Sequence, residues 1–158
     1  MKNSFKASMM FGIVLVGLVL LAGIQLRATA VEVGEGRNLE GTWITSVTQV
    51  DCVSGAPVAP VFPGILSFHH GGTMSGTSAV APAVFGTWDR TGAEFRFAGT
   101  FLRYNSSGVY VGRQTIRQKV TLGQGGGEFT SSGSVEILDT NGNMIGNGCA
   151  TSIGIKFE

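Results

Sequence analysis

Short stretches rich in Val, Ile, Thr and Phe alternate with turn residues from Asn38 to the C-terminus of this chain. No apolar stripe recurs at the 3.6-residue period of a helix, and alternation at a period of two is typical of strands. The chain also has 25 glycines in 158 residues, and glycine costs a helix about 1 kcal/mol relative to alanine. The pattern predicts an all-β protein, with strands near 41–50, 64–70, 73–79, 84–90, 93–104, 109–121, 127–138 and 143–157.

The connections between these predicted strands are mostly short and suit tight hairpins. Residues 71–72, 105–108, 123–127 and 139–142 are rich in glycine and asparagine, which tolerate positive φ. The one long connection, 51–63, contains Pro57, Pro60 and Pro63, so we expect it to lie outside the sheet. Sequential hairpins favour a single antiparallel up-and-down β-barrel of about eight strands, because closure leaves no exposed edge. A β-sandwich is the alternative, but it would need more long connections.

The N-terminal residues have the order typical of a signal peptide. Lys2 and Lys6 precede an apolar run from about residue 9 to 24, and the small residues 28–30 follow it. We therefore expect a signal helix and peptide over 1–30, cleaved after Ala30, a short linker over 31–38 and a β-barrel domain over 39–158. An uncleaved run could instead anchor the chain, since a membrane span needs about 18 apolar residues or more. The expected location is secreted, periplasmic or extracellular.

The charge balance gives no reason to expect a highly charged partner. The chain has 11 basic and 10 acidic residues, and loss of the leader would remove only basic ones. Nucleic acid is therefore not an expected partner, and a membrane is expected only through an uncleaved leader. The sequence does not indicate the oligomeric state.

Both tryptophans follow the same dipeptide, in Gly41-Thr42-Trp43 and Gly86-Thr87-Trp88. A glycine in this position lets the chain bend at the start of a strand while the indole lies across the barrel end. Gly41-Thr42-Trp43 resembles the Gly-x-Trp signature on the first strand of the lipocalin and avidin-like barrels, the calycins, and the strand count agrees. The resemblance implies a small secreted barrel that binds a small molecule. The lipocalin Thr-Asp-Tyr motif and the several tryptophans of the avidin-like biotin site are not present.

Strand alternation predicts which side chains face the interior of the barrel. In 93–104 it places Phe95, Phe97 and Phe101 inside, and in 109–121 the cations Arg113 and Arg117 should face water. A phenylalanine row with amides between its members could hold a small apolar or amphipathic molecule. The leading hypothesis is an exported, non-enzymatic barrel that binds such a ligand, with the candidate ligand-binding residues Trp43, His70, Trp88, Phe97, Tyr110, Gln114 and Gln118.

The only cysteines, Cys52 and Cys149, follow the first predicted strand and lie in the last one. These strands are neighbours if the barrel closes, so a disulfide could join them, and export would preserve it. The only histidines, His69 and His70, are adjacent and would point to opposite faces of a strand. No zinc-ligand spacing occurs, so we expect neither a metal nor another cofactor.

Two other functions stay open at this point. A barrel enzyme of cyclase or isomerase type would fit the size of the chain, which resembles allene-oxide-cyclase and dirigent barrels, and would need Tyr110, Gln114 and His70 to converge. No catalytic residue is assigned, because no nucleophile motif or triad can be proposed. A structural or partner-binding module of the cell envelope would instead use the connection 51–63, through Val58, Val61 and Phe62.

Overall fold

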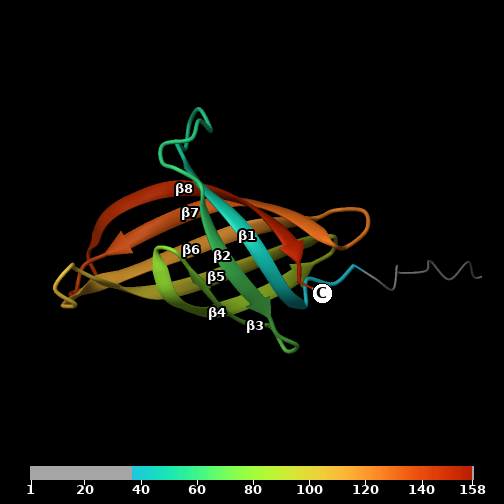
Figure 1. Cartoon of the computed structure of the whole chain (residues 1–158), viewed down its shortest axis with the longest axis horizontal. Coiled ribbons are helices and arrows are strands. Elements are labelled where there is room, and N and C mark those ends of the chain that lie inside the picture. Colours follow the sequence, from blue (N-terminus) through green and yellow to red (C-terminus); the bar gives the residue numbers. More distant parts are fainter. Residues whose placement is uncertain (1–36, 158) are drawn as a thin grey trace, which may run out of the picture. The chain divides into compact units, whose positions relative to one another are not determined.

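The computed structural model describes residues 37–157, which form a closed barrel of antiparallel strands (Figure 1). Each strand pairs with the next one along the chain, and the last pairs with the first. The predicted all-β, up-and-down barrel is therefore confirmed, and the sandwich is excluded. The strands are β1 Gly41–Val50, β2 Phe62–Phe68, β3 Thr73–Ser78, β4 Ala81–Thr91, β5 Glu94–Tyr104, β6 Tyr110–Leu122, β7 Glu128–Leu138 and β8 Met144–Lys156.

The start of β2 differs from its prediction, because the strand includes a proline. Pro63 was expected outside the sheet, but it is the second residue of β2 and pairs with Ser46 of β1. Proline is tolerated near the start of a strand, where its missing N–H is not needed. Its carbonyl oxygen accepts a hydrogen bond from the Ala79 N–H at 3.1 Å, so Pro63 still takes part in the barrel.

The predicted signal peptide over 1–30 lies outside the described residues, as does the linker except for Arg37 and Asn38. Both stay predictions. From residue 37 to residue 157, no helix is long and apolar enough to cross a membrane.

The topology gives the barrel two different ends. The β1–β2, β3–β4, β5–β6 and β7–β8 connections all lie at one end, because alternate connections of an up-and-down barrel share a side. We call the end with these four connections the open end. The other end, here the closed end, carries the remaining connections together with residues 37–40 and the end of β8. The completely buried side chains of Leu39 and Trp43 lie at this closed end, with Phe68 and Phe129.

Trp43 is the centre of the closed end. Its indole Nε1 donates a hydrogen bond to the Leu39 carbonyl oxygen at 2.8 Å, which holds residues 37–40 against the barrel. The ring of Phe129 packs edge-on at 4.9 Å between centroids, and the Lys156 ammonium lies 5.4 Å from the centroid of the indole. Gly41 has φ of 119°, and a Cβ there would lie 2.9 Å from the Lys156 Cε. The glycine before Trp43 thus allows the bend that the sequence predicts.

Trp88 also lies at the closed end, but its glycine has a different role. The half-buried Trp88 ring packs against Phe68 and Phe95, and its Nε1 donates to the His69 carbonyl oxygen at 2.9 Å. Gly86 lies inside β4 rather than at a bend, so the prediction is wrong for this position. A Cβ on Gly86 would overlap the Ala98 carbonyl oxygen, because β5 passes too close for any side chain.

Candidate functional site

The barrel interior is filled at the closed end and hollow at the open end. The hollow has a volume of about 90 Å³ and lies among inward residues from the middle of the barrel to its open end. Exposed residues such as Gln49 and Val80 line its outer part, so it communicates with solvent at the open end. We call this hollow the lumen cavity.

The inner part of the lumen cavity is apolar. Its lining there includes the buried side chains Leu66, Val84, Phe97 and Phe101, with the half-buried Ile116. These side chains come from β2, β4, β5 and β6. Every second residue of a strand faces the interior, except where a bulge, such as the one in the β3–β4 pair, shifts the alternation. An apolar group that enters from the open end would leave water and contact these side chains.

A short chain of polar groups crosses one side of the same cavity. The Ser131 hydroxyl donates to the Gln118 Oε1 at 3.2 Å and lies 2.6 Å from the Ser152 hydroxyl oxygen. Because Ser131 has one proton to donate, the proton between the two serines comes from Ser152. The hydrogen bonds of the Gln118 side chain within the described residues run to its oxygen, which leaves its amide N–H groups available to the cavity. The cavity therefore offers a hydrogen-bond donor beside an apolar surface.

The structure brings together three of the seven candidate ligand-binding residues. Phe97, Gln114 and Gln118 all line the lumen cavity, as their alternation predicts. Trp43 is buried as expected, and Trp88 is half-buried, but both belong to the closed end and do not line the cavity.

His70 does not face the interior. Its side chain is 94% exposed, and its Nδ1 lies 3.0 Å from the Glu40 Oε1. The prediction extended β2 to residue 70, whereas the strand ends at Phe68 and the β2–β3 turn begins there. Strand alternation does not apply beyond the last paired residue.

Tyr110 is also on the outside, with 41% of its surface exposed, and its ring packs against Tyr104. The cause is a β-bulge in the β5–β6 pair, where Arg103 pairs with Gly112 and the next residue, Tyr104, pairs with Tyr110. Gly112 has φ of 131°, and the extra residue of a bulge interrupts the alternation of the strand. Residues on the β6 side after Gly112 keep the predicted inward order.

The sequence did not identify the residues that leave the cavity empty. On β8 the inward residues Gly148, Ala150 and Ser152 are small, and Ala150 and Ser152 line the cavity. The next inward residue, Gly154, lies at the closed end, where the Phe129 ring fills the space beside it. Strand alternation alone could have predicted that these β8 residues face inward. Their small side chains were the signal in the sequence for an unfilled space. Thr45 of β1, which lines the cavity, and Ser131 of β7, which bonds to Gln118 and Ser152, were missed for the same reason, since both are small buried polar residues.

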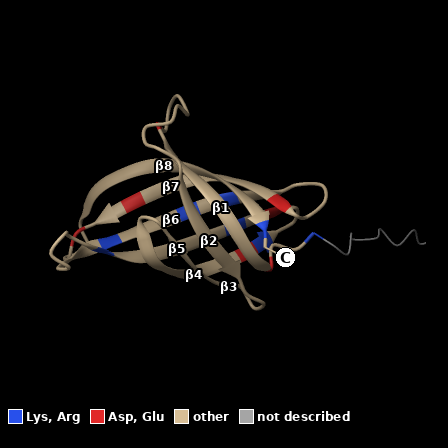
Figure 2. Ribbon diagram, in the orientation of Figure 1, with Lys and Arg blue, Asp and Glu red and all other residues tan. Residues whose placement is uncertain are grey.

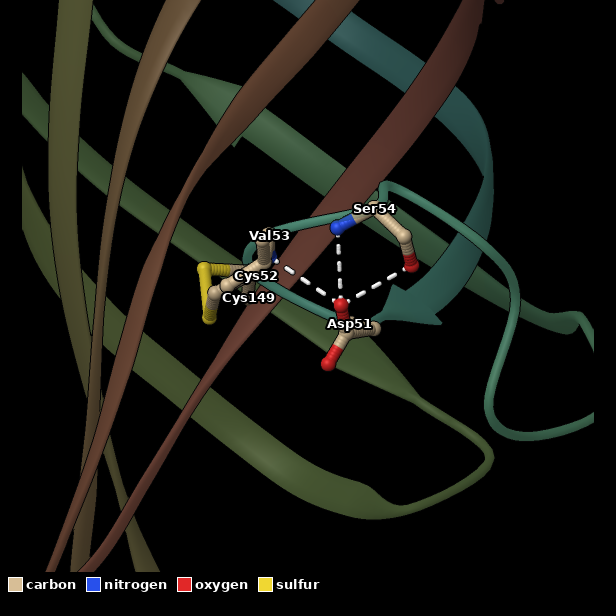
Figure 3. Close-up of a disulfide and its surroundings, with 5 residues drawn as sticks. All are labelled: Asp51, Cys52, Val53, Ser54 and Cys149. Atoms are coloured by element: carbon tan, nitrogen blue, oxygen red, sulfur yellow. Dashed lines mark hydrogen bonds between the residues drawn. A yellow bond between two sulfur atoms is a disulfide. The ribbon is translucent and has the colours of Figure 1, made fainter.

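The predicted disulfide is present beside the open end. Cys52 and Cys149 are bonded with Cα atoms 5.2 Å apart (Figure 3), within the range of about 4.4–6.8 Å that disulfides favour. Val50 of β1 pairs with Cys149 of β8, so the bond ties the turn after β1 to β8 across the closure of the barrel. A disulfide is typical of proteins in an oxidising compartment.

The turn that follows β1 is held by one carboxylate. The Asp51 Oδ1 accepts hydrogen bonds from the Ser54 N–H and hydroxyl, both at 2.8 Å, and from the Val53 N–H at 3.1 Å (Figure 3). The bonds from Ser54, followed by the one from Val53, hold the pKa of Asp51 below its usual value. These bonds fix the chain on both sides of Cys52.

The lowered pKa predicts how this turn responds to acid. Because the folded-state pKa lies below the unfolded value, the bonds stabilise the turn fully above the usual aspartate range and are lost as the pH falls through the lower, folded-state pKa. We expect the amide resonances of Val53 and Ser54 to titrate together with a midpoint below that of an unperturbed aspartate. Asp51→Ala should remove this titration, and a midpoint at or above the usual value would contradict the account.

A barrel enzyme of cyclase or isomerase type would need Tyr110, Gln114 and His70 to lie close together. They do not. His70 lies at the closed end, Gln114 lines the lumen cavity, and Tyr110 packs on the outside near the open end. Residues 37–157 contain no group of three or more His, Cys, Asp or Glu side chains that could hold a metal ion. The lumen cavity is therefore the site whose geometry supports a function.

No protein family, curated protein or solved structure matches this chain. The fold assignment accordingly rests on the strand pairing. An eight-strand antiparallel barrel is compatible with the calycin resemblance, whose specific support is Gly41-Thr42-Trp43 at the closed end.

Proposed function

We propose that this protein is an exported, non-enzymatic barrel of calycin type that binds a small apolar or amphipathic molecule in the lumen cavity. The observation that carries the proposal is the contrast between the two ends: large aromatic side chains fill the closed end, while small residues of β8 leave space at the open end. Closed barrels of this strand number can hold one small ligand.

The size and lining of the cavity narrow the ligand class. At about 90 Å³ the cavity is well below the roughly 300–1,000 Å³ of sites for drug-sized ligands. The ligand is therefore a compact molecule of few heavy atoms, or the end of an aliphatic chain that enters through the open end. An oxygen that accepts a hydrogen bond from the Gln118 amide, next to the apolar floor, gives the preferred ligand an amphipathic character.

Two further observations support export. The Cys52–Cys149 disulfide suits an oxidising compartment, and the residues before the barrel have the composition of a signal peptide. The test is N-terminal sequencing of the protein from an exporting host, which should begin at Val31. A chain that retains Met1 would contradict cleavage.

The binding proposal predicts a chain-length limit. Straight-chain alcohols from butanol to decanol, titrated by calorimetry into the protein expressed from its full coding sequence, should bind with an affinity that rises with length and then levels off. The rise reflects about 0.8 kcal/mol for each CH₂ that leaves water, and the plateau marks the chain that fills the cavity.

A variant that fills the cavity tests where the alcohols bind. Ala150 is buried and lines the cavity, so Ala150→Leu should weaken hexanol binding by about tenfold or more, since it replaces the space that the ligand needs. Ser132→Leu adds the same side chain on the outer face of the neighbouring strand β7 and should leave binding unchanged. Equal affinities for the two variants, with both still folded, would exclude the lumen cavity as the site.

A further inference from the structure

The outside of the barrel is divided into a charged side and an uncharged side. Among the described strands, every Lys, Arg, Asp and Glu except Lys156 belongs to β4, β5, β6 or β7. Strands β1, β2 and β3 have none, and Figure 2 shows them tan over their whole length. The side chain of Lys156 lies over the Trp43 ring at the closed end.

The uncharged side carries a contiguous apolar surface. Ile44 of β1 lies directly between Ile155 of β8 and Ile65 of β2 in the strand register, and Ile153 is the next outward residue on β8. These four side chains are 45–57% exposed. Val61 is exposed as well and borders the same hollow as Ile153. We call Ile44, Ile65, Ile153, Ile155 and Val61 the isoleucine face.

This surface is large enough to form the centre of a stable interface. Five aliphatic side chains, each about half exposed, present an apolar area on the order of 400 Å², as large as the biggest patches on monomeric proteins, which are often functional. Hydroxyl-bearing outward residues border it: Ser46 and Thr48 of β1, and Thr77 of β3, which pairs with Ile65. A standard interface buries roughly 800 Å² per partner, so the apolar face would supply about half of it, and a core depleted of charge within a polar rim is the usual composition.

We propose that the isoleucine face binds the isoleucine face of a second copy of this chain, as a two-fold symmetric dimer. In such a dimer the same patch is used by both partners, so a residue at the axis meets its own copy. A charge there would face a like charge, which costs binding energy. The complete absence of charge from the middle of this face, on a barrel that carries charges on four other strands, meets this condition.

The surroundings of the face favour a second copy over a lipid surface. Proteins that lie on membranes combine apolar residues with Lys and Arg at their border and with interfacial Trp or Tyr. The border of the face carries both signs of charge rather than cations alone: Lys119 and Glu94 line the hollow beside Ile153, and Lys156 and Glu128 adjoin Ile155. Both tryptophans belong to the closed end, and the Tyr104–Tyr110 pair is on β5 and β6. A partner whose contact surface is uncharged at its centre and carries both signs at its border fits this face, and a second copy of the face has this composition.

Charge substitution at the centre of the face tests the proposal. The full chain should form dimers in sedimentation velocity across a concentration series. Ile44→Lys and Ile44→Glu should each raise the dimer dissociation constant by about 100-fold or more, since each places like charges together across the axis. Leu102→Glu, a matched change at an equally exposed position on the outer face of β5, should leave the dimer intact.

Mixing the two Ile44 variants distinguishes a symmetric dimer from the binding of any other partner. Equimolar Ile44→Lys and Ile44→Glu chains should form a heterodimer, because opposite charges then meet across the axis. A wild-type protein that stays monomeric at every concentration would overturn the proposal, as would dimers that tolerate both substitutions. Folded variants whose mixture remains monomeric would overturn the symmetric arrangement. Alcohol binding in the lumen cavity is measured separately, so its presence or absence does not affect these outcomes.

Discussion

Replacing Cys52 and Cys149 together by serine should lower the melting temperature of this protein by about 10 °C. The two cysteines are 97 residues apart in the sequence, so their bond restricts nearly the whole barrel sequence in the unfolded state. Disulfides typically contribute about 2–4 kcal/mol, and about 1 kcal/mol corresponds to several degrees for a domain of this size. The measurement is thermal unfolding followed by circular dichroism.

Reduction of the wild-type protein provides the control for this prediction. A phosphine reductant should lower the melting temperature of the wild type to that of the double variant and should leave the variant unchanged. The strand pairing of β1 with β8 remains in both cases, so the reduced protein should still fold. A wild-type melting temperature that does not respond to complete reduction would show that the bond contributes nothing to stability.

Trp43→Ala should produce the second large effect, a loss of about 3–5 kcal/mol in the free energy of unfolding. Trp43 is completely buried, and the change would remove its contact with Phe129 and its hydrogen bond to the Leu39 carbonyl oxygen. Residues 37–40 would then lose the group that holds them against the barrel. Chemical denaturation followed by far-UV circular dichroism, which does not depend on tryptophan emission, measures the loss.

The second tryptophan is the matched comparison. Trp88→Ala should cost clearly less than Trp43→Ala, because Trp88 is half-buried and packs at the edge of the same aromatic group. Equal losses for the two variants would contradict the assignment of Trp43 as the centre of the closed end. The shared Gly-Thr-Trp sequence thus hides two different positions, one at the start of β1 and one within β4.

The strand order and the disulfide could be predicted because they depend on local patterns. Alternation of apolar and polar residues identified all eight strands, and short turns required sequential pairing. Closure then placed β8 beside β1, which brought Cys52 and Cys149 together. Each of these steps depends only on short-range sequence patterns and on the requirement that every strand edge is paired.

The errors arise where the backbone departs from regular pairing. His70 was placed inside because the end of β2 cannot be read from apolar residues alone, and Tyr110 because the bulge before Gly112 has no apolar pattern. The lumen cavity could not be sized from the sequence, since its volume depends on how the Phe97 and Phe101 rings pack across the barrel from Ala150 and Ser152. Packing of this kind is a property of the assembled core.

The most direct test of the hollow open end is methyl-resolved NMR of the full chain during a hexanol titration. We expect saturable shifts for the methyl groups of Val84, Ile116 and Val135, which line the lumen cavity, and none for those of Leu39 and Val120, which are buried at the closed end. Shifts of equal size at both ends, or no saturable shift before hexanol reaches its solubility limit, would contradict a ligand-binding cavity in this barrel.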